Sequence, residues 1–385
     1  MNSKQFRGGY SESINMLRFP LALLVVFVHS FGAGIDVAQL HASGFSGMAI
    51  YDYVRLLCSV VVAGSAVPIF FIISGYLLFL NVEGYGKQVY LRKMKKRWHS
   101  LVIPYLTWNV LFVLCTLAFK IGGILLHGKP WDSIGEYFIQ NGFLHMLWDS
   151  SVWRERTTWL GVATHSSGPV LLPFWYMRDL IVMVVLSPVF YWLIKKLRFL
   201  FILLMMAVYA FDIRVTWMSG TFMVAGLFFG LGAYFAIMKQ DFTDVLWRWR
   251  YAILPLATIL MAVQTYMGSS MGDSISRMIN PWLVIILSAA LIIVSSAMCR
   301  HRRLYEASKR LGSTSFFVYA LHPFILKPVI SLVYKAMPLV DTWYMHIVSY
   351  LAVPLVCATV CVGMYWAIRM YMPSVMSMLM GERRR

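Results

Sequence analysis

Long apolar runs recur along almost the whole chain and are separated by short polar segments. A helix that crosses a membrane needs about 20 mostly apolar residues. The pattern predicts ten such helices, over 14–34, 56–81, 101–126, 170–194, 198–212, 216–238, 251–268, 280–299, 313–336 and 342–370. The fifth is the weakest, because only the 13 residues Phe199–Phe211 support it. The expected fold is an all-α polytopic membrane protein.

The composition agrees with this fold class. Of the 385 residues, 60% are hydrophobic and 13% are charged, and the mean hydropathy is +0.69. Soluble domains average about 45–50% apolar and about 25% charged residues, so the composition excludes disorder and an ordinary soluble enzyme. The five cysteines and nine histidines show no metal-ligand spacing. We therefore expect neither a metal site nor a disulfide framework.

The basic residues predict the orientation, because cytoplasmic loops carry an excess of Lys and Arg. The chain has 34 basic and 16 acidic residues, a net charge of +18. If all ten segments span from a cytoplasmic N-terminus, 23 of the 34 basic residues fall inside and nine outside. The inner face then carries +17 and the outer face is near neutral. We expect both termini in the cytoplasm and no nucleic-acid partner.

Two ionisable residues lie in the first predicted span, where such groups are costly and are candidates for function. Arg18 and His29 are 11 positions apart, so they share one helix face and stand ~16 Å apart along the axis. Arg18 could be an interface anchor whose side chain reaches the membrane surface, and His29 could be a polar group packed between helices. Alternatively, Arg18 holds a phosphate-bearing group at the inner surface and His29 acts as a base near the outer one. The pair also counts against a cleaved signal peptide, the other interpretation of this segment.

Polar residues also interrupt the second and ninth spans. Ser74 follows an apolar run in the second span, where helix packing alone would explain it. In the ninth span Tyr319 and His322 are three residues apart and share a helix face. His322 precedes Pro323, so a structural role at a proline kink is the alternative to a functional one.

The fourth span places opposite charges on adjacent residues, Arg178 and Asp179. Adjacent positions on a helix point about 100° apart. We therefore expect that the two do not simply pair with each other, and that at least one reaches another helix or a polar cavity.

The predicted cytoplasmic segment 87–100 is strongly basic. Leu91, Met94 and Trp98 recur at i, i+3 and i+7, which is typical of an amphipathic helix on a membrane surface. Such a segment usually helps to set the orientation of the protein in the membrane and attracts anionic lipid. The alternative is capture of a polyanionic cosubstrate, for which the candidate cations are Arg92, Lys96 and Arg97.

The longest predicted outer loop, about 120–169, contains four tryptophans. Such residues favour the lipid–water interface, and sugar binding is the alternative. No repeat or linker separates a second domain. We expect one membrane domain with a core at about 12–370 and no fused extracytoplasmic domain.

Five motifs follow one another along the spans. They are the Arg18–His29 pair, Phe70-Phe71-Ile72-Ile73-Ser74-Gly75-Tyr76, Arg97 before Ile103-Pro104-Tyr105, Phe174-Trp175-Tyr176, and Gly312-Ser-Thr-Ser-Phe-Phe-Val-Tyr-Ala-Leu-His322. In order and spacing they resemble the acyltransferase-3 family of integral membrane acyltransferases, over about residues 12–370. The chain departs from the family at Ser100, where many members carry a second Arg. A phosphate contact from that position is therefore not expected.

The resemblance implies an acyltransferase that moves an acyl group, most often acetyl from acetyl-CoA. The acceptor it implies is a hydroxyl or amine of an exported or surface glycan or glycolipid. Acyl-CoA is then a cosubstrate, and no tightly bound cofactor is expected. The implied location is the bacterial inner membrane, where lipids surround the chain.

The resemblance also assigns roles to particular residues. His29 would deprotonate the acceptor or carry the acyl group as an acyl-imidazole. Arg18 and the cations of segment 87–100 suit the phosphates of CoA. Hydrogen bonds to the thioester or acceptor would come from Ser74, Tyr319 and His322, and Arg178 and Asp179 are further candidates without an assigned role.

A transporter or lipid-linked glycan flippase is the alternative from another functional class. Ten spans and buried ionisable residues would suit it as well. It would move its substrate without covalent change, and it often has two corresponding broken helices. The hydropathy pattern shows no convincing pair of these.

Overall fold

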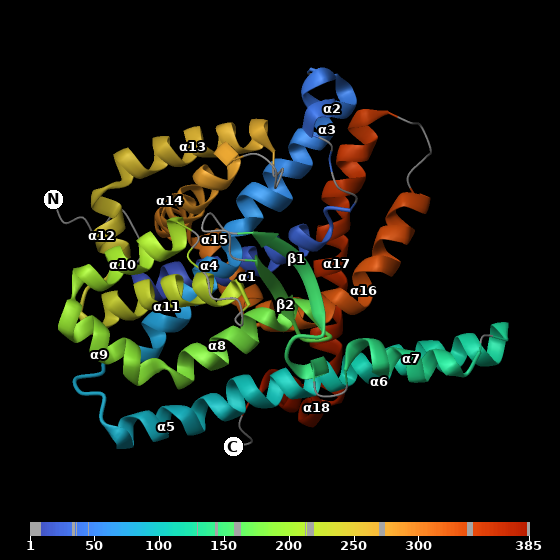
Figure 1. Cartoon of the computed structure of the whole chain (residues 1–385), viewed down its shortest axis with the longest axis horizontal. Coiled ribbons are helices and arrows are strands. Elements are labelled where there is room, and N and C mark those ends of the chain that lie inside the picture. Colours follow the sequence, from blue (N-terminus) through green and yellow to red (C-terminus); the bar gives the residue numbers. More distant parts are fainter. Residues whose placement is uncertain are drawn as a thin grey trace. The chain divides into compact units, whose positions relative to one another are not determined.

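The computed structural model describes residues 9–32, 35, 37–44, 46–128, 130–142, 145–157, 163–211, 213, 219–268, 274–336 and 342–382. The helices of the first half of the chain are α1 Tyr10–His29, α2 Val37–Ala42, α3 Gly47–Arg55, α4 Ala66–Phe79, α5 Lys87–Arg97, α6 Ile103–His127, α7 Asp132–Asn141, α8 Trp175–Val185 and α9 Ser187–Leu197. Those of the second half are α10 Phe199–Ala210, α11 Thr221–Ile237, α12 Phe242–Arg248, α13 Arg250–Met267, α14 Ser274–Met298, α15 Arg302–Gly312, α16 Ser315–Ala336, α17 Trp343–Tyr371 and α18 Pro373–Met380 (Figure 1). π-helical segments at Leu56–Val62 and Trp98–Val102 and 3-10 turns at Ala63–Ser65, His145–Leu147 and Leu172–Phe174 connect some of them.

The chain forms two compact units that interleave along the sequence. The first unit comprises residues 1–81 and 231–366, and the second comprises residues 82–230 and 367–385. Their boundaries fall inside α11 and α17 as well as between α4 and α5. The prediction of one membrane domain over about 12–370 stays a prediction.

In the first unit α1 packs against α4, α14, α15 and α16. The start of α1 is fixed by a hydrogen bond of 2.9 Å from the Gly9 amide to the Glu12 carboxylate, which satisfies one of the open amides near the helix start. Buried residues of α1 recur at helical spacing and mark the face that contacts its neighbours: Ile14, Leu17, Leu21 and Val25. The sequence of α1 thus builds a helix that is held from several sides.

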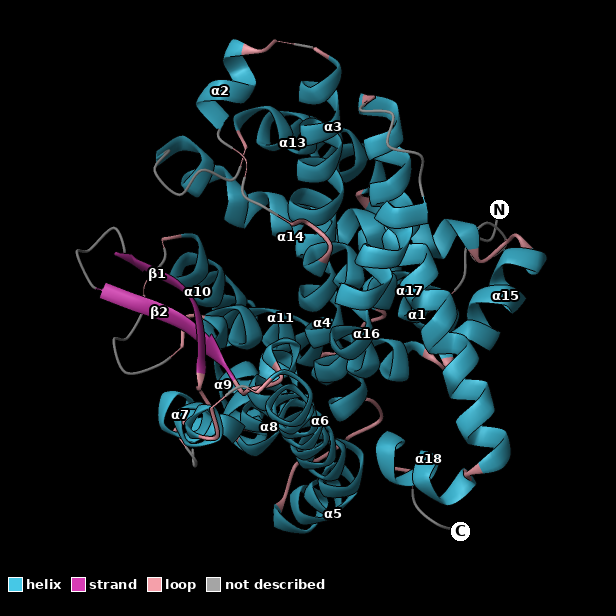
Figure 2. Ribbon diagram, turned by 90° about the vertical axis from the view of Figure 1, so that its right-hand side faces the viewer, coloured by secondary structure: helices cyan, strands magenta, loops and turns pink. Residues whose placement is uncertain are grey.

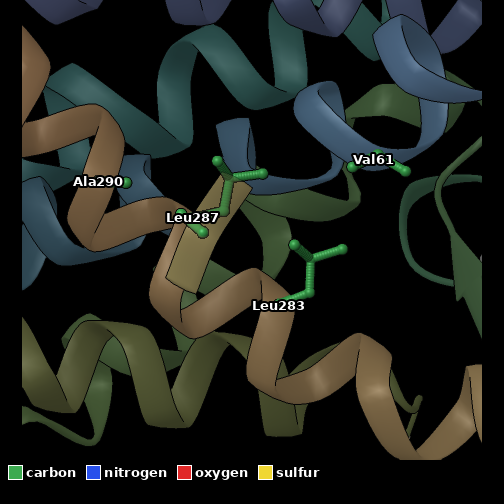
Figure 3. Packing of buried hydrophobic residues seen from close by; sticks show 5 residues of the cluster. Val61, Leu283, Leu287 and Ala290 are labelled. Carbon is green, nitrogen blue, oxygen red and sulfur yellow. The ribbon is translucent and has the colours of Figure 1, made fainter. Parts of the chain in front are cut away.

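A second apolar contact joins α13, α14 and the π-helical segment that precedes α4. Figure 3 shows Leu283, Leu287 and Ala290 of α14 beside Val61, and Ala257 of α13 completes the cluster. All five side chains are at most 4% exposed. Interlocking aliphatic side chains of this kind leave few alternative positions for the helices.

Within the first unit, α11 approaches α4 closely at Gly232. A Cβ atom built at Gly232 would lie 1.9 Å from the Ile72 carbonyl oxygen and 2.8 Å from the Tyr76 amide nitrogen. Both are backbone atoms, which cannot turn away as a side chain can. Only glycine therefore permits this helix contact, as is common where membrane helices pack closely.

The second unit contains α5, α6 and the bent pair α8–α9. A hairpin also lies in it, made of β1 Ser151–Thr157 and the antiparallel β2 Ala163–Gly168 (Figure 2). The prediction of an all-α fold included no strands. The register shifts between Val152 and Arg154, which indicates a bulge in β1. Of the four loop tryptophans, Trp159 lies outside the described residues.

Six stretches of the described chain are long and apolar enough to cross a membrane: Tyr10–His29, Gly47–Phe79, Lys87–His127, Met278–Met298, Ser315–Ala336 and Trp343–Tyr371. The pairs α8–α9 and α11–α12, bent by 63° and 101°, raise the number to eight if each pair is one span. The remaining two predicted spans correspond to α10, with 12 residues, and α13. The chain is therefore an all-α multi-pass membrane protein apart from the hairpin.

The count of ten spans and the cytoplasmic position of both termini stay predictions. The orientation rests in part on basic residues near the two ends of the chain. These residues, Lys4, Arg7 and Arg383–Arg385, lie outside the described residues.

Candidate functional site

His29 is the last residue of α1, and two side chains fix the chain at this point. The Ser59 hydroxyl donates to the Phe27 carbonyl. Arg55 donates to the Phe31 carbonyl through Nε at 3.1 Å and Nη2 at 2.6 Å. The Phe27 carbonyl, in the last turn of α1, also accepts from the Ser30 amide at 3.1 Å, and Phe31 lies just beyond the helix. The half-buried imidazole of His29 is thereby held between two anchored points.

Arg55 is a part of this site that the sequence analysis missed. Its side chain is largely buried, its Nη1 donates to the Asp52 carboxylate at 2.7 Å, and its guanidinium lies 4.7 Å from the centroid of the Phe31 ring. Arg55 is one of the nine basic residues that the ten-span topology places outside, and no further role was predicted for it. The spacing of Asp52 and Arg55, three residues apart in α3, is a signal that could have indicated a fixed ion pair.

His322 of α16 meets His29 of α1 inside the first unit. The centroids of the two imidazole rings are 5.2 Å apart, and the ring planes are inclined by 36°. His322 is 0% exposed, so water has no access to its ring. Two histidines that are 293 positions apart in the sequence are therefore neighbours in space.

The local sequence of α16 sets the hydrogen bonding of His322. In a regular helix the amide of residue 323 would donate to the carbonyl of residue 319, but Pro323 has no N–H. His322 Nδ1 instead forms a hydrogen bond of 2.8 Å with the Tyr319 carbonyl. A carbonyl only accepts, so Nδ1 carries the proton and Nε2 keeps a lone pair. Among the described residues, Nε2 of His322 has no hydrogen-bond partner.

The other two first-unit candidates lie elsewhere on α1 and α4. Arg18 is exposed. It lies beside Gly312 of α15, since a Cβ atom built at Gly312 would be 3.9 Å from the Arg18 Cβ. Eleven positions of helix separate Arg18 from His29, ~16 Å along the axis. Ser74 is half-buried in α4, which packs against α1. The structure thus joins His29, His322 and Tyr319 in one group.

The basic segment forms α5 in the second unit, as the sequence pattern predicts. Arg92 and Lys96 are exposed, and Arg97 is half-buried at the end of the helix, directly before the π-helical turn Trp98–Val102. Tyr85 lies close enough to interact electrostatically with Arg97 and forms a 2.8 Å hydrogen bond with Ser187. π-helical turns are frequent at functional positions in helices. The geometry therefore keeps Arg97 as a candidate for binding an anion.

Arg178 and Asp179 do pair with each other, so the expectation that they would not is wrong. Arg178 Nε donates to Asp179 Oδ1 at 2.8 Å, and Nη2 lies 2.7 Å from the same oxygen. The Arg side chain is long enough to fold back along α8, which the simple 100° argument ignored. The guanidinium also donates to the Trp148 carbonyl at 2.8 Å and to the Thr221 hydroxyl at 3.0 Å. The second part of the expectation, contact with another element, is correct.

The described residues offer little to a metal ion. Within the described ranges, no three His, Cys, Asp or Glu side chains lie close enough together to hold one. The available chemistry is that of imidazoles in the first unit and of cations in the second. Imidazoles can transfer protons, and the cations of α5 can, separately, bind anions.

Comparison with known proteins identifies the family of the chain. The family model for the acyltransferase domain, Acyl_transf_3, matches residues 11–372. The chain is also similar to the succinoglycan biosynthesis protein ExoH of Rhizobium meliloti (strain 1021), with 22% identity over 388 residues, which cover 97% of this chain and 92% of that protein. No solved structure matches the chain. The family model covers nearly the whole sequence, including His29, His322 and Arg97. The chain therefore belongs to the acyltransferase-3 family of integral membrane acyltransferases.

Proposed function

We propose that the protein transfers an acyl group, in the first instance acetyl, from acyl-CoA to a hydroxyl or amine of an exported or surface glycan or glycolipid. The observation that carries the proposal is the meeting of His29 and His322 within an acyltransferase chain. Similarity to a succinoglycan biosynthesis protein supports a glycan as the acceptor. The bacterial relative supports the bacterial inner membrane as the location.

His29 acts as the general base in this proposal. Its unprotonated nitrogen takes the proton from the acceptor hydroxyl while the oxygen attacks the thioester carbonyl. The tetrahedral intermediate then collapses as the C–S bond breaks. The CoA sulfur leaves with the proton from His29, so the imidazole returns to its starting state. His29 lies at the end of α1 and is half-buried, which suits this role because its ring is not fully enclosed by the protein.

A covalent route through the same residue is the variant of this mechanism. The His29 imidazole would first attack the thioester and carry the acyl group as an acyl-imidazole. The acceptor would then displace the imidazole. The two routes can be distinguished with a donor labelled on its acyl group, because only the covalent route places the label on the protein during turnover.

The donor is bound by cations in this proposal. CoA carries a pyrophosphate and a 3′-phosphate, and charge-assisted hydrogen bonds from arginine are the strongest that such groups receive. Arg97 is the first candidate, followed by Arg92 and Lys96 on the exposed face of α5, and Arg18 on α1 is a separate candidate. Ser74 and Tyr319 remain candidates for hydrogen bonds to the thioester or acceptor.

The test uses purified protein in nanodiscs with acetyl-CoA labelled on the acetyl group and a crude glycan extract. Release of CoA and the destination of the label are followed for the wild type and His29→Ala. We expect the wild type to label the glycan, and His29→Ala to lose about 10²–10⁴-fold in turnover. The melting temperature should stay near that of the wild type. His301→Asn, an exposed histidine of the first unit, is the matched control and should retain full activity.

The outcomes separate the remaining alternatives. Label on the protein after rapid quenching, absent in His29→Ala, would establish the acyl-imidazole route. Label transfer from succinyl-CoA or a longer acyl-CoA in place of acetyl-CoA would change the donor but keep the reaction. If no donor releases CoA while a glycolipid crosses the bilayer unmodified, the flippase replaces the acyltransferase.

A further inference from the structure

The lone pair on His322 Nε2 is a feature that the mechanism above does not use. It exists because Pro323 frees the Tyr319 carbonyl, which the Nδ1–H group of His322 then occupies. The tautomer is thereby fixed, with the proton on Nδ1 and an acceptor at Nε2. This acceptor is buried and has no partner among the described residues. Leaving a buried acceptor without a partner is costly, so a site that keeps one is prepared for a donor.

The imidazole of His29 neighbours the ring that carries this acceptor. A linear N–H···N bond of about 3 Å between two imidazoles places their centroids about 5 Å apart. The observed separation is 5.2 Å. The rings are inclined by 36° and do not yet form that bond. The separation of the two rings therefore already suits the bond, and what differs is their relative orientation.

We propose that His322 is a positioning residue whose Nε2 accepts a hydrogen bond from an N–H group of His29. This proposal rests on the proposed function. In neutral His29 the bond places the proton on the nitrogen nearer His322, which leaves the lone pair of the other nitrogen for the acceptor hydroxyl. When His29 takes the proton of the acceptor, both its nitrogens carry hydrogen, and His322 binds the one that faces the protein.

The proton balance of the reaction is unchanged by this role. One proton moves from the acceptor oxygen to His29 and then to the departing CoA sulfur. His322 keeps its Nδ1 proton throughout and neither gains nor loses one. It does for His29 what a buried hydrogen-bond acceptor does for the histidine of a Ser-His-Asp triad: it holds the ring orientation and tautomer.

Two substitutions test the role of the Nε2 acceptor separately from that of the hydrogen bond between Nδ1 and the Tyr319 carbonyl. In His322→Asn the amide nitrogen takes the place of Nδ1 and keeps the bond to the Tyr319 carbonyl, but no atom reaches the place of Nε2. In His322→Gln the amide end reaches that place and offers an oxygen acceptor. We expect His322→Asn to lower kcat by about 100-fold with the KM for acyl-CoA within about threefold of the wild type. His322→Gln should recover at least about tenfold of that loss.

A second measurement does not depend on the variants being active. The wild type is labelled with ¹⁵N-histidine, and the imidazole nitrogen shifts of His322 are assigned by comparison with His322→Asn. We expect a protonated Nδ1 and an unprotonated Nε2. A proton on Nε2 would overturn the proposal, because that nitrogen could then not accept from His29.

Failure of this proposal is distinguishable from failure of the proposed function. An enzyme that transfers acyl groups and needs His29, but in which His322→Asn and His322→Gln have equal kcat values, would refute the acceptor role alone. Absence of acyl transfer in the wild type, or full activity of His29→Ala, would refute the proposed function. His301→Asn again serves as the matched control.

Discussion

Each unit buries a polar group among apolar helices, and the two groups differ in how completely their hydrogen bonds are used. Arg178 of the second unit donates through Nε, Nη1 and Nη2, and its guanidinium lies 5.1 Å from the centroid of the Phe222 ring. His322 of the first unit donates through Nδ1 and leaves Nε2 without a partner in the described chain. Both side chains are almost fully buried.

The difference separates a structural group from a reactive one. A guanidinium whose three nitrogens all donate to groups of its own chain has little capacity left for a substrate. An imidazole with a fixed tautomer and a free buried lone pair has a defined orientation and can still accept a hydrogen bond from a reacting group. Asp179 lies between these cases, since its Oδ1 is bound by Arg178 while its Oδ2 has no partner among the described residues. We therefore assign Arg178 to the support of the second unit and His322 to the chemistry of the first.

The largest effect on stability is expected for Arg178→Met. The substitution leaves the Asp179 carboxylate buried without its counter-charge and removes the bonds to the Trp148 carbonyl and the Thr221 hydroxyl. Breaking one side of a buried ion pair costs about 3–5 kcal/mol. Thermal unfolding of the purified protein in nanodiscs should show a clearly lowered melting temperature, and little folded protein should be obtained.

The double variant Arg178→Met/Asp179→Leu is the control for this interpretation. Replacing both partners of a buried pair by apolar residues is often close to neutral. The double variant should therefore be more stable than the single one. A melting temperature of Arg178→Met equal to that of the wild type would contradict the structural assignment and reopen a catalytic role for this pair.

Gly232→Ala tests stability in the first unit without touching any polar group. Its new methyl group would lie 1.9 Å from the Ile72 carbonyl oxygen, so α4 and α11 would have to separate. Overpacking of this kind costs about 1–3 kcal/mol, and the melting temperature should fall accordingly. Gly226→Ala on the same helix is the matched control, because no described atom lies within 4 Å of a Cβ built there. If both variants melt alike, the close approach at Gly232 does not limit the packing.

Much of the fold could be predicted because each membrane helix requires a long run of apolar residues, which is recognisable in the sequence. The ends of α1, α14, α16 and α17 lie within a few residues of the predicted ones, except for the start of α14. The bends at Leu186 and between α11 and α12 could not be predicted, because an apolar run has the same composition whether it is straight or broken. The hairpin at 151–168 was missed because its strands lie in a polar loop without a clear hydrophobic alternation.

The candidate site was predicted in its members but not in its arrangement. His29 and His322 were each selected as ionisable groups in an apolar span, yet nothing in the sequence shows that α1 meets α16 at these two positions. The hydrogen bond of His322 could have been predicted from the sequence. Pro323 has no N–H, so the Tyr319 carbonyl lacks its usual helical donor and can accept from the His322 side chain. The pairing of Arg178 with Asp179 was predicted wrongly because side-chain length was not weighed against helix angle.

The smallest effect is expected for Arg18→Ala, and it sharpens the comparison between buried and exposed cations. Unlike Arg178, Arg18 is exposed, so its loss should leave the melting temperature unchanged. If its guanidinium binds a phosphate of CoA, the KM for acyl-CoA should rise about tenfold, which corresponds to about 1.4 kcal/mol, the size of one charge-assisted hydrogen bond. Arg18→Lys should restore part of the affinity, because it keeps the charge but loses the bidentate fork. Arg303→Ala, an exposed cation of α15, controls for general attraction of the donor to a basic surface. An equal rise in KM for both alanine variants would show diffuse attraction, and an unchanged KM in Arg18→Ala would remove Arg18 from the donor site.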